Sequence, residues 1–459
     1  MNNIEQKFYQ SKQFFKTNKT KELKFRKHQL KILRKSIKNH ENELLEALEK
    51  DLGKNNVEAY ATEIGVLLKS IKIARKELKN WTKTKQVDTP LYLFPTKSYI
   101  KNEPYGTVLI IGPFNYPVQL VFEPLIGAIA AGNTAIVKPS EHTPNVASVI
   151  RKIIEDSFDS NYISVVEGGI NETQTLIHLP FDYMFFTGSE KVGKVVYEAA
   201  AKNLVPVTLE LGGKSPVIVD ETANIKVASE RISFGKFTNA GQTCVAPDYI
   251  LIDRKVKNDL IDALKQTITE FYGKNIKESP DFGRIVNEKH FNRLNELLEI
   301  DKNNIVFGGK SSKQDLYIEP TILENINVQD KVMQEEIFGP ILPILTYDSF
   351  DEAIEIIQSK PKPLSLYLFS EDENASHRVL DKLLFGGGAI NDTLIHVANP
   401  NLPFGGVGAS GIGQYHGKYS FDTFSHMKSY TFKSTRLESS VYFPPYKGKF
   451  KYIKAFFKN

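Results

Sequence analysis

From Gly106 onward, short β-branched apolar runs alternate with helical stretches, and this alternation constrains the fold more than any other feature of the chain. The predicted strands are Thr107–Ile111, Thr134–Val137, Tyr162–Val166, Tyr183–Phe186 and Val207–Leu211. A helical stretch follows each of the first four. Strict alternation of this kind builds a parallel sheet with helices on both faces. The fold class is therefore α/β, with a doubly wound parallel sheet that binds its ligand at the carboxyl ends of its strands.

The alternation restarts at Ser215 and predicts a second α/β domain. Two other segments, Tyr92–Glu103 and Ser429–Lys433, have strand-like composition, and we expect them to pair into a small β element outside both domains. Helical periodicity before residue 85 is interpreted as helices that cover a domain surface. The predicted units are 1–85 with 104–210, then 211–397, then 86–103 with 398–435 as the small β element, and a basic-aromatic tail at 436–459.

Composition excludes several classes of protein. The chain has 59 Lys and Arg against 54 Asp and Glu, and this net charge of +5 over 459 residues does not indicate a nucleic-acid-binding protein. Its single cysteine excludes an intramolecular disulfide and argues against a cysteine-based zinc site. The polar N-terminus resembles no secretory signal, and no apolar run reaches 18 residues. We therefore expect a cytoplasmic protein.

Three residues in loops or at strand ends could carry chemistry. Cys244 follows Gly241-Gln242-Thr243 in a predicted loop, where a thiol can be exposed, although its ordinary pKa of about 8.5 requires local activation. Glu210 ends a buried strand, and burial would raise its pKa toward that of a general base. Asn115 lies in a proline-flanked turn and could donate to an oxyanion. Each residue alone has an ordinary structural explanation.

Together these residues and their motifs resemble the aldehyde dehydrogenase superfamily over nearly the whole chain. The motifs that carry the resemblance are Leu209–Pro216, Gly241–Cys244, Phe185–Ser189 with Val192-Gly193, Gln334–Pro340 and Pro403–Gly411. The short chain, the Phe-Asn-Tyr-Pro loop and the Phe443–Tyr446 segment are similar to the class 3 branch, which includes fatty-aldehyde dehydrogenases. The resemblance implies NAD(P)-dependent oxidation of an apolar aldehyde, either a fatty aldehyde or an apocarotenoid aldehyde.

The resemblance also implies a role for each site residue. Cys244 would attack the aldehyde carbon, the Asn115 amide and the Cys244 N–H would hold the oxyanion, and Glu210 would activate water to hydrolyse the thioester. The implied cofactor-binding residues are Lys138, Glu141, Gly188, Ser189, Gly193, Glu336 and Phe338. A carboxylate at Glu141 should repel a 2′-phosphate, which favours NAD. Lys138 beside it weakens that repulsion, and class 3 relatives often accept both cofactors, so NADP stays an alternative.

Two other patterns are not taken at face value. Gly406–Gly411 fits the G-x-G-x-x-G pattern, but no strand precedes it and no clear helix opens after it, so it is rejected as a dinucleotide loop, and the resemblance implies an active-site loop instead. Five histidines are scattered without the spacing of metal ligands, and we expect no metal site. They are His142, His178, His290, His396 and His416. Two alternative functions remain: a cysteine acyltransferase or hydrolase, which would need a histidine base, and a non-catalytic binding protein on the same scaffold.

The C-terminal segment combines aromatic residues with lysines. Tyr446, Phe450, Ile453 and Phe457 would share one face of a helix. This pattern is typical of a membrane-surface helix, and it is equally compatible with a tail folded over a partner subunit or over the mouth of the active site. We expect a homodimer, and peripheral membrane contact through this tail stays one of the two alternatives.

Overall fold

The computed structural model describes residues 3–437 and 440–457, and its first domain is built on a six-stranded sheet. The strand order is β17 (Gly411–Ile412), β7 (Val207–Glu210), β6 (Tyr183–Thr187), β3 (Thr107–Ile111), β4 (Thr134–Lys138) and β5 (Ile163–Val165). All neighbours are parallel except β17, which runs antiparallel to β7. Because β4 and β5 lie on one side of β3 while β6 and β7 lie on the other, the sheet is doubly wound, as predicted.

Both faces of this sheet are buried, as its continuous apolar strands require. Val108 and Ile110 of β3 pack in a core with helices from one face, whereas Leu109 and Ile111 pack in a separate core on the other. The helices between the strands are α6 (Gln119–Ala131), α7 (Pro144–Ser157), α8 (Ile170–Ile177) and α9 (Glu190–Ala201). The predicted helices at these positions are confirmed to within a few residues.

The second domain has a seven-stranded sheet with an independent core. Its order is β10 (Ile305–Phe307), β13 (Thr321–Leu323), β14 (Ile341–Tyr347), β9 (Tyr249–Asp253), β8 (Pro216–Val219), β15 (Ser365–Phe369) and β16 (Gly387–Ile390). Only β10 is antiparallel to its neighbour. Its helices are α10 (Ile225–Phe237), α11 (Lys257–Tyr272), α12 (Glu288–Ile300), α13 (Phe350–Gln358) and α14 (Glu373–Lys382), and β11 (Ser311–Ser312) pairs with β12 (Tyr317–Ile318).

Helices before the first strand cover both faces of the first domain. They are α1 (Asn3–Lys16), α2 (Leu23–Asn39), α3 (Glu41–Leu52), α4 (Asn56–Ala59), a π-helical turn (Tyr60–Ile64) and α5 (Gly65–Trp81). Helix α1 contacts β3, β4 and α8, whereas α2 contacts α5, α6 and α7. The predicted covering role is therefore confirmed, but the segment between α3 and α5 does more than cover a surface, as the site shows.

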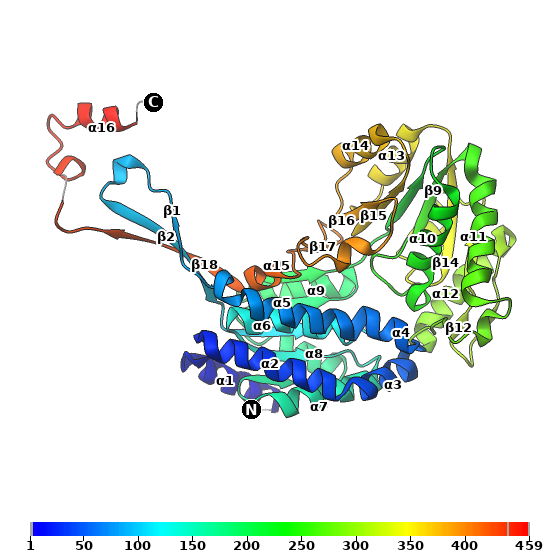
Figure 1. The fold of residues 1–459 in the computed structure, drawn as a ribbon, viewed down its shortest axis with the longest axis horizontal. Helices are drawn as coiled ribbons and strands as arrows, with labels where there is room; N and C mark the ends of the chain where they lie inside the picture. The colour runs from blue at the N-terminus through cyan, green and yellow to red at the C-terminus, as the bar shows by residue number, and fades with distance from the viewer. Residues whose placement is uncertain (1–2, 438–439, 458–459) are drawn as a thin grey trace.

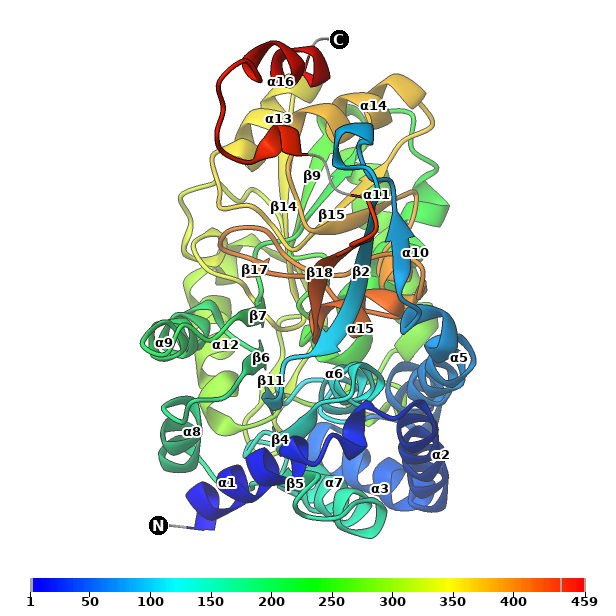
Figure 2. The same ribbon diagram turned by 90° about the vertical axis from the view of Figure 1, so that its left-hand side faces the viewer.

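A three-stranded antiparallel arm projects from the two domains (Figure 1). In the arm, β2 (Thr96–Pro104) pairs with β1 (Lys85–Val87) on one side and with β18 (Ser425–Lys433) on the other, which confirms the predicted pairing of these two distant segments. Helix α15 (Lys418–Thr423) joins the arm to α6, and α16 (Phe450–Phe456) lies at the far end of the arm (Figure 2). Across the described residues, we find no helix with the length and hydropathy needed to cross a membrane.

Candidate active site

The carboxyl ends of three neighbouring strands bring the predicted residues of the first domain together. Asn115 follows β3, Gly188 follows β6, and Glu210 is the last residue of β7. Glu210 pairs with Thr187 of β6 on one side and with Gly411 of β17 on the other. Parallel strands end at the same edge of a sheet, so this is the edge at which a doubly wound sheet binds its ligand.

Glu210 is buried without a hydrogen-bond partner. The residue is 2 % exposed, and no described residue hydrogen-bonds either carboxylate oxygen. Burial raises its pKa well above the ordinary value. A buried carboxyl group that no protein group satisfies is costly, so such groups mark places where a water molecule or a ligand supplies the missing hydrogen bonds. Glu210 therefore has the environment of a general base.

The loop that carries Cys244 has a strained backbone. After α10, the residues Asn239, Ala240 and Gly241 have φ values of 54°, 51° and 75° in succession. Such conformations are unfavourable for residues other than glycine, and they persist where the surroundings hold them. A Cβ at Gly241 would lie 2.3 Å from the Gly339 carbonyl oxygen, so only glycine allows this loop to approach the Gln334–Pro340 motif.

The Cys244 thiol lies close to two acidic side chains. Cys244 is half-buried, and burial raises its pKa to about 12, with Glu336 and Glu210 raising it further and the N–H groups of Cys244 and Val245 opposing the shift. The thiol is therefore protonated at neutral pH in the free protein, and it must lose this proton before it can attack. The structure thus brings Cys244 from the second domain together with Glu210 from the first.

Asn115 is held through its backbone. It is 3 % exposed, and its carbonyl oxygen accepts hydrogen bonds from Lys54 Nζ and from Asn239 Nδ2, both at 2.9 Å. The next residue, Tyr116, shares a 2.7 Å hydrogen bond with Thr243, the neighbour of Cys244. Asn115 and Cys244 therefore stand on two loops that are bonded directly to each other.

Sequence reasoning missed the charged partner of Asn115, although Glu63 carried a signal for it. Lys54 forms an ion pair with Glu63 at 2.6 Å, and both side chains are fully buried. Glu63 falls on the apolar face of the predicted helix, four residues before the buried Leu67 and eight before the buried Ile71. A carboxylate on an apolar helix face predicts a buried partner.

The predicted cofactor-binding residues of the first domain lie at the same sheet edge. Lys138 ends β4, is buried, and forms a 3.0 Å ion pair with Glu141. Burial opposes ionisation of Glu141, but its own backbone N–H and Lys138 outweigh it and lower the pKa, so the carboxylate is anionic. Glu141 follows β4 at the carboxyl edge of the sheet, and an acid at such a strand end can bind the hydroxyl groups of a ribose.

The turn between β6 and α9 fits a phosphate. Ser189 caps α9 by accepting a hydrogen bond from the Val192 N–H, and the helix N-terminus faces the carboxyl edge of the sheet. A Cβ at Gly193 would lie 2.6 Å from Leu211, so glycine permits close packing of helix on strand. A Cβ at Gly188 would likewise lie 2.6 Å from the Phe186 ring. Free backbone N–H groups at a helix start attract a pyrophosphate.

Glu336 and Phe338 approach from the second domain. A Cβ at Gly212 would lie 2.1 Å from Glu336 Oε2, so Glu336 lies against the turn that follows β7. Burial and Asp248 raise its pKa to about 8. Phe338 packs edge-on against Phe114, with ring centroids 5.7 Å apart. Both residues therefore face groups of the first domain.

Buried charges that the sequence did not reveal support this segment. Lys214 bonds to Asp248 and donates to the Glu335 carbonyl at 3.0 Å, while Asp248 accepts from the Ile337 N–H at 2.9 Å. Arg293 of α12 donates to the Ile337 carbonyl at 2.5 Å. These contacts fix the backbone between Glu335 and Phe338.

The Gly406–Gly411 segment reaches the site at its last residue, because Gly411 pairs with Glu210. The helix nearest after Gly406–Gly411 is α15, and Gly411 itself begins β17, so the segment has no strand–turn–helix context. Within the described residues, no three or more His, Cys, Asp or Glu side chains are placed to hold a metal ion. His142 and His290 do meet across the two domains, with ring centroids 6.3 Å apart. Burial, Arg293 and His142 lower the pKa of His290 to about 4.

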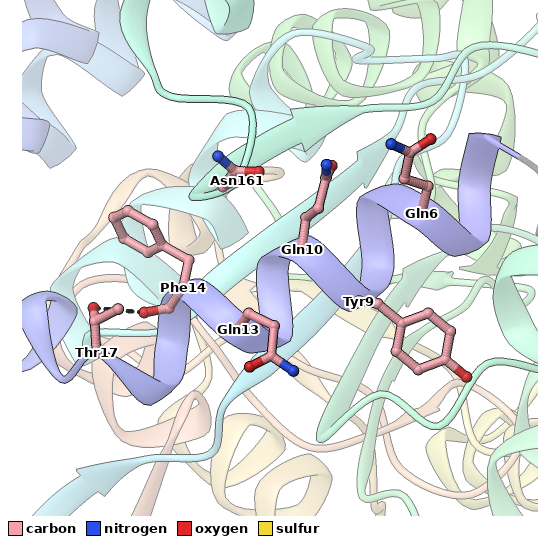
Figure 3. Close-up of a pocket in the computed structure, with 7 residues that line it drawn as sticks. All are labelled: Gln6, Tyr9, Gln10, Gln13, Phe14, Thr17 and Asn161. Atoms are coloured by element: carbon pink, nitrogen blue, oxygen red, sulfur yellow. Dashed lines mark hydrogen bonds between the residues drawn. The ribbon is translucent and has the colours of Figure 1, made fainter.

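A surface groove of about 510 Å³ along α1 is a separate feature (Figure 3). Its lining is formed by Gln6, Tyr9, Gln10, Gln13, Phe14, Thr17 and Asn161. None of these residues belongs to the constellation around Cys244, and the groove contains no acid–base pair. It therefore takes no part in the chemistry proposed below.

The Cys244 thiol of the second domain lies near Glu210 and the Asn115 loop of the first, an arrangement typical of the aldehyde dehydrogenase class. The model of the aldehyde dehydrogenase family matches residues 2–430, and the chain belongs to this family. It is 76% identical to 4,4′-diaponeurosporen-aldehyde dehydrogenase of Staphylococcus aureus (strain NCTC 8325 / PS 47) over 459 residues, which is 100% of both chains.

Other relatives and a solved structure agree. The chain is 45% identical to aldehyde dehydrogenase family 3 member A2 of Mus musculus, covering 96% of this chain and 91% of that one. It is 43% identical to the dimeric NADP-preferring aldehyde dehydrogenase of Rattus norvegicus, covering 97% and 98%. The structure described as the substrate-bound state of Staphylococcus aureus AldH matches with a TM-score of 0.99 and 75% identity over 100% of both chains.

These matches confirm the superfamily, the class 3 resemblance and the α/β fold predicted from the sequence. The protein is an NAD(P)-dependent aldehyde dehydrogenase, and its substrate is an aldehyde. The alternatives of a cysteine acyltransferase or hydrolase and of a non-catalytic binding protein are therefore set aside.

Proposed function

We propose that Cys244, Glu210 and Asn115 carry the reaction, and the observation that supports this most directly is the unpartnered, buried Glu210 carboxyl group beside the thiol. The Cys244 thiol loses its proton to solvent, and the thiolate attacks the aldehyde carbon to form a thiohemiacetal whose oxyanion accepts from the Asn115 amide and the Cys244 N–H. After oxidation, Glu210 removes a proton from water, which attacks the thioester carbonyl. The C–S bond breaks, the carboxylic acid leaves, and the Cys244 thiolate takes up the proton that Glu210 removed from water.

The proposed cofactor residues fit a dinucleotide. Lys138 and Glu141 would hold the adenosine ribose, Gly188, Ser189 and Gly193 the pyrophosphate, and Glu336 with Phe338 the nicotinamide riboside. When bound, NAD(P) accepts the hydride that the thiohemiacetal carbon loses. The anionic Glu141 favours NAD over NADP because it repels a 2′-phosphate, while its ion pair with Lys138 reduces that repulsion.

Two variants test these roles. Cys244→Ala should abolish NADH formation, because no covalent intermediate can form. Asn115→Ala should lower kcat by about 10²- to 10³-fold, the usual effect of removing one oxyanion donor, while leaving the Kd for NAD unchanged. Dehydrogenase activity that survives Cys244→Ala would overturn the proposal.

We further propose that the substrate is a long apolar aldehyde. Cys244, Tyr116, Leu394 and Val397 are partly buried and all pack against the first-domain core. In the same loop Ile395 is 58 % exposed. Partly exposed apolar side chains of this kind can bind hydrocarbon. The 76%-identical relative is named for the apocarotenoid aldehyde 4,4′-diaponeurosporenal, and we propose the same substrate here, with fatty aldehydes as the second candidate.

A panel of aldehydes of increasing length, assayed with NAD and with NADP, tests the substrate proposal. We expect kcat/KM to rise with chain length and to be highest for the polyene aldehyde. Equal kcat/KM for acetaldehyde and for the polyene would refute an apolar site.

We propose that the arm forms a homodimer and that the domains act as predicted, with 1–85 and 104–210 binding the cofactor, 211–397 carrying the nucleophile, and 86–103 with 398–435 bridging subunits. In support, β18 is the edge strand of the arm sheet, paired with β2 on one side, and its Met427 and Phe432 are 69 % and 68 % exposed. Exposed apolar edges pair with another chain. Phe432→Glu should shift the sedimenting species toward the monomer; an unchanged dimer would contradict this interface.

The C-terminal tail, 436–459, is proposed to contact a membrane surface. Phe457 packs on Tyr92 at 5.2 Å between ring centroids, which anchors the tail at the tip of the arm, while Tyr446 and Phe450 are exposed beside lysines. Deleting residues 447–459 should abolish co-sedimentation with anionic liposomes. Unchanged binding would favour the alternative that the tail covers a partner subunit.

A further inference from the structure

The ion pair between Lys54 and Glu63 lies in the protein interior without a role in the proposed chemistry. The two residues are 1% and 0% exposed, and their charged atoms are 2.6 Å apart. Removing two charges from water is so unfavourable that an apolar pair of similar volume is often at least as stable. The pair therefore needs an explanation other than stability, and its remaining hydrogen bonds indicate one.

Each member of the pair holds one part of the Asn115 loop. Lys54 donates to the Asn115 carbonyl at 2.9 Å, and its ammonium lies 4.0 Å from the centre of the Tyr116 ring. The second oxygen of Glu63 accepts from the N–H groups of Val118 and Gln119 at 2.8 and 3.2 Å.

These two N–H groups open α6. A carboxylate at a helix N-terminus satisfies donors that the helix cannot and interacts favourably with the helix dipole. The pair thus fixes the start of the loop at the Asn115 carbonyl and its end at the first turn of α6.

The Asn115 carbonyl is also connected to the loop that carries Cys244. Asn239 Nδ2 donates both to the Asn115 carbonyl that Lys54 holds and to the Gln242 carbonyl at 3.1 Å. Asn239 itself has the left-handed φ of 54°, so its position depends on these bonds. Lys54 therefore stands where the backbone of the Asn115 loop meets the backbone that leads to Cys244.

We propose that Lys54 and Glu63 are positioning residues that set the distance between the Asn115 amide and the Cys244 thiol. They act through these two loops and do not touch the substrate. Because misplacement of a reacting group by about 1 Å lowers rates by about 100-fold, loosening either loop should lower kcat more than it raises KM. The inference rests on the proposed role of Asn115.

The test uses the full-length enzyme and three variants with a matched control. Lys54→Met should lower kcat by about 10- to 100-fold with an unchanged Kd for NAD. Glu63→Gln keeps an acceptor for the α6 N–H groups and should lower kcat less. If Lys54→Met fails to fold, the charge-free double variant Lys54→Met/Glu63→Leu replaces it, with the same expected loss.

The control is Arg26→Met. Arg26 is buried and braces the opposite end of α6 by donating to the Ala130 carbonyl at 3.1 Å. It should lower the unfolding temperature as much as Lys54→Met does and leave kcat unchanged. If the two variants lose equal activity at equal loss of stability, Lys54 has only a structural role and the inference fails.

A double variant separates this inference from the proposed function. If Lys54 acts through Asn115, then Lys54→Met/Asn115→Ala should be no slower than Asn115→Ala alone, because residues that act through one another are not additive. Multiplicative losses overturn the inference. Full activity of Asn115→Ala overturns the proposed function instead, whereas a slow Asn115→Ala beside a fully active Lys54→Met overturns only the positioning role.

Discussion

Gly212→Ala should weaken cofactor binding without unfolding the protein. The new Cβ would lie 2.1 Å from Glu336 Oε2 and 2.7 Å from the other two carboxylate atoms. To restore an ordinary contact of about 3.4 Å, Oε2 must move by about 1.3 Å (3.4 − 2.1). The carboxylate ends a flexible side chain and can move, but a hydrogen bond from it to a ribose hydroxyl would be lost.

The expected magnitude follows from that lost bond. A hydrogen bond to a charged group contributes about 1.5–3 kcal/mol, so the Kd for NAD should rise by about 10- to 150-fold. Titration calorimetry measures this Kd, and thermal unfolding should shift by no more than a few degrees. Gly169→Ala is the matched control, because its Cβ would meet no atom within 4 Å. An unchanged Kd with a lowered unfolding temperature would refute the placement of Glu336 at the ribose.

Three other predictions concern the site. Since burial raises the Cys244 pKa to about 12, alkylation of the free enzyme by iodoacetamide should accelerate about tenfold per pH unit from 7 to 9; a plateau near pH 8 would contradict it. Burial raises the pKa of Glu210 in the native state, so the native state loses stability as the pH rises above the pKa of this carboxyl in the unfolded chain. Glu210→Gln should therefore unfold at a higher temperature than the parent at pH 8, and the difference should vanish near pH 4. Ala240→Gly should relieve the φ of 51° and stabilise the protein by roughly 1 kcal/mol in denaturant titration; a loss of stability would show that the strain is compensated there.

The sequence predicted the sheets because strands that are buried on both faces appear as continuous apolar runs, and Thr107–Ile111 is such a run. It also predicted the pairing of β2 with β18, although more than 300 residues separate them, because neither segment fits a helix or a domain strand. The local pattern of apolar residues and the turn residues therefore predicted most of the fold.

The site was predicted less completely, and the missing residues share a physical reason. Lys54, Glu63 and Asn239 act on backbone atoms of other segments, and a contact to a distant carbonyl or N–H leaves no motif in the local sequence. Lys214 and Arg293 likewise donate to backbone carbonyls of a distant segment. The strained turn at Asn239 and Ala240 was equally invisible, because their residue types are ordinary and tertiary contacts impose the conformation.

Trapping the covalent intermediate on Glu210→Gln tests the central claim most directly. Glutamine cannot take a proton from water, so the reaction should stop at the thioester. One equivalent of NADH per active site should appear in a burst, and intact-mass spectrometry should find Cys244 carrying the acyl group in place of its thiol hydrogen. Steady turnover at the parent rate, or a burst of NADH with an unmodified Cys244, would contradict the assignment of Cys244 as nucleophile and Glu210 as the base for hydrolysis.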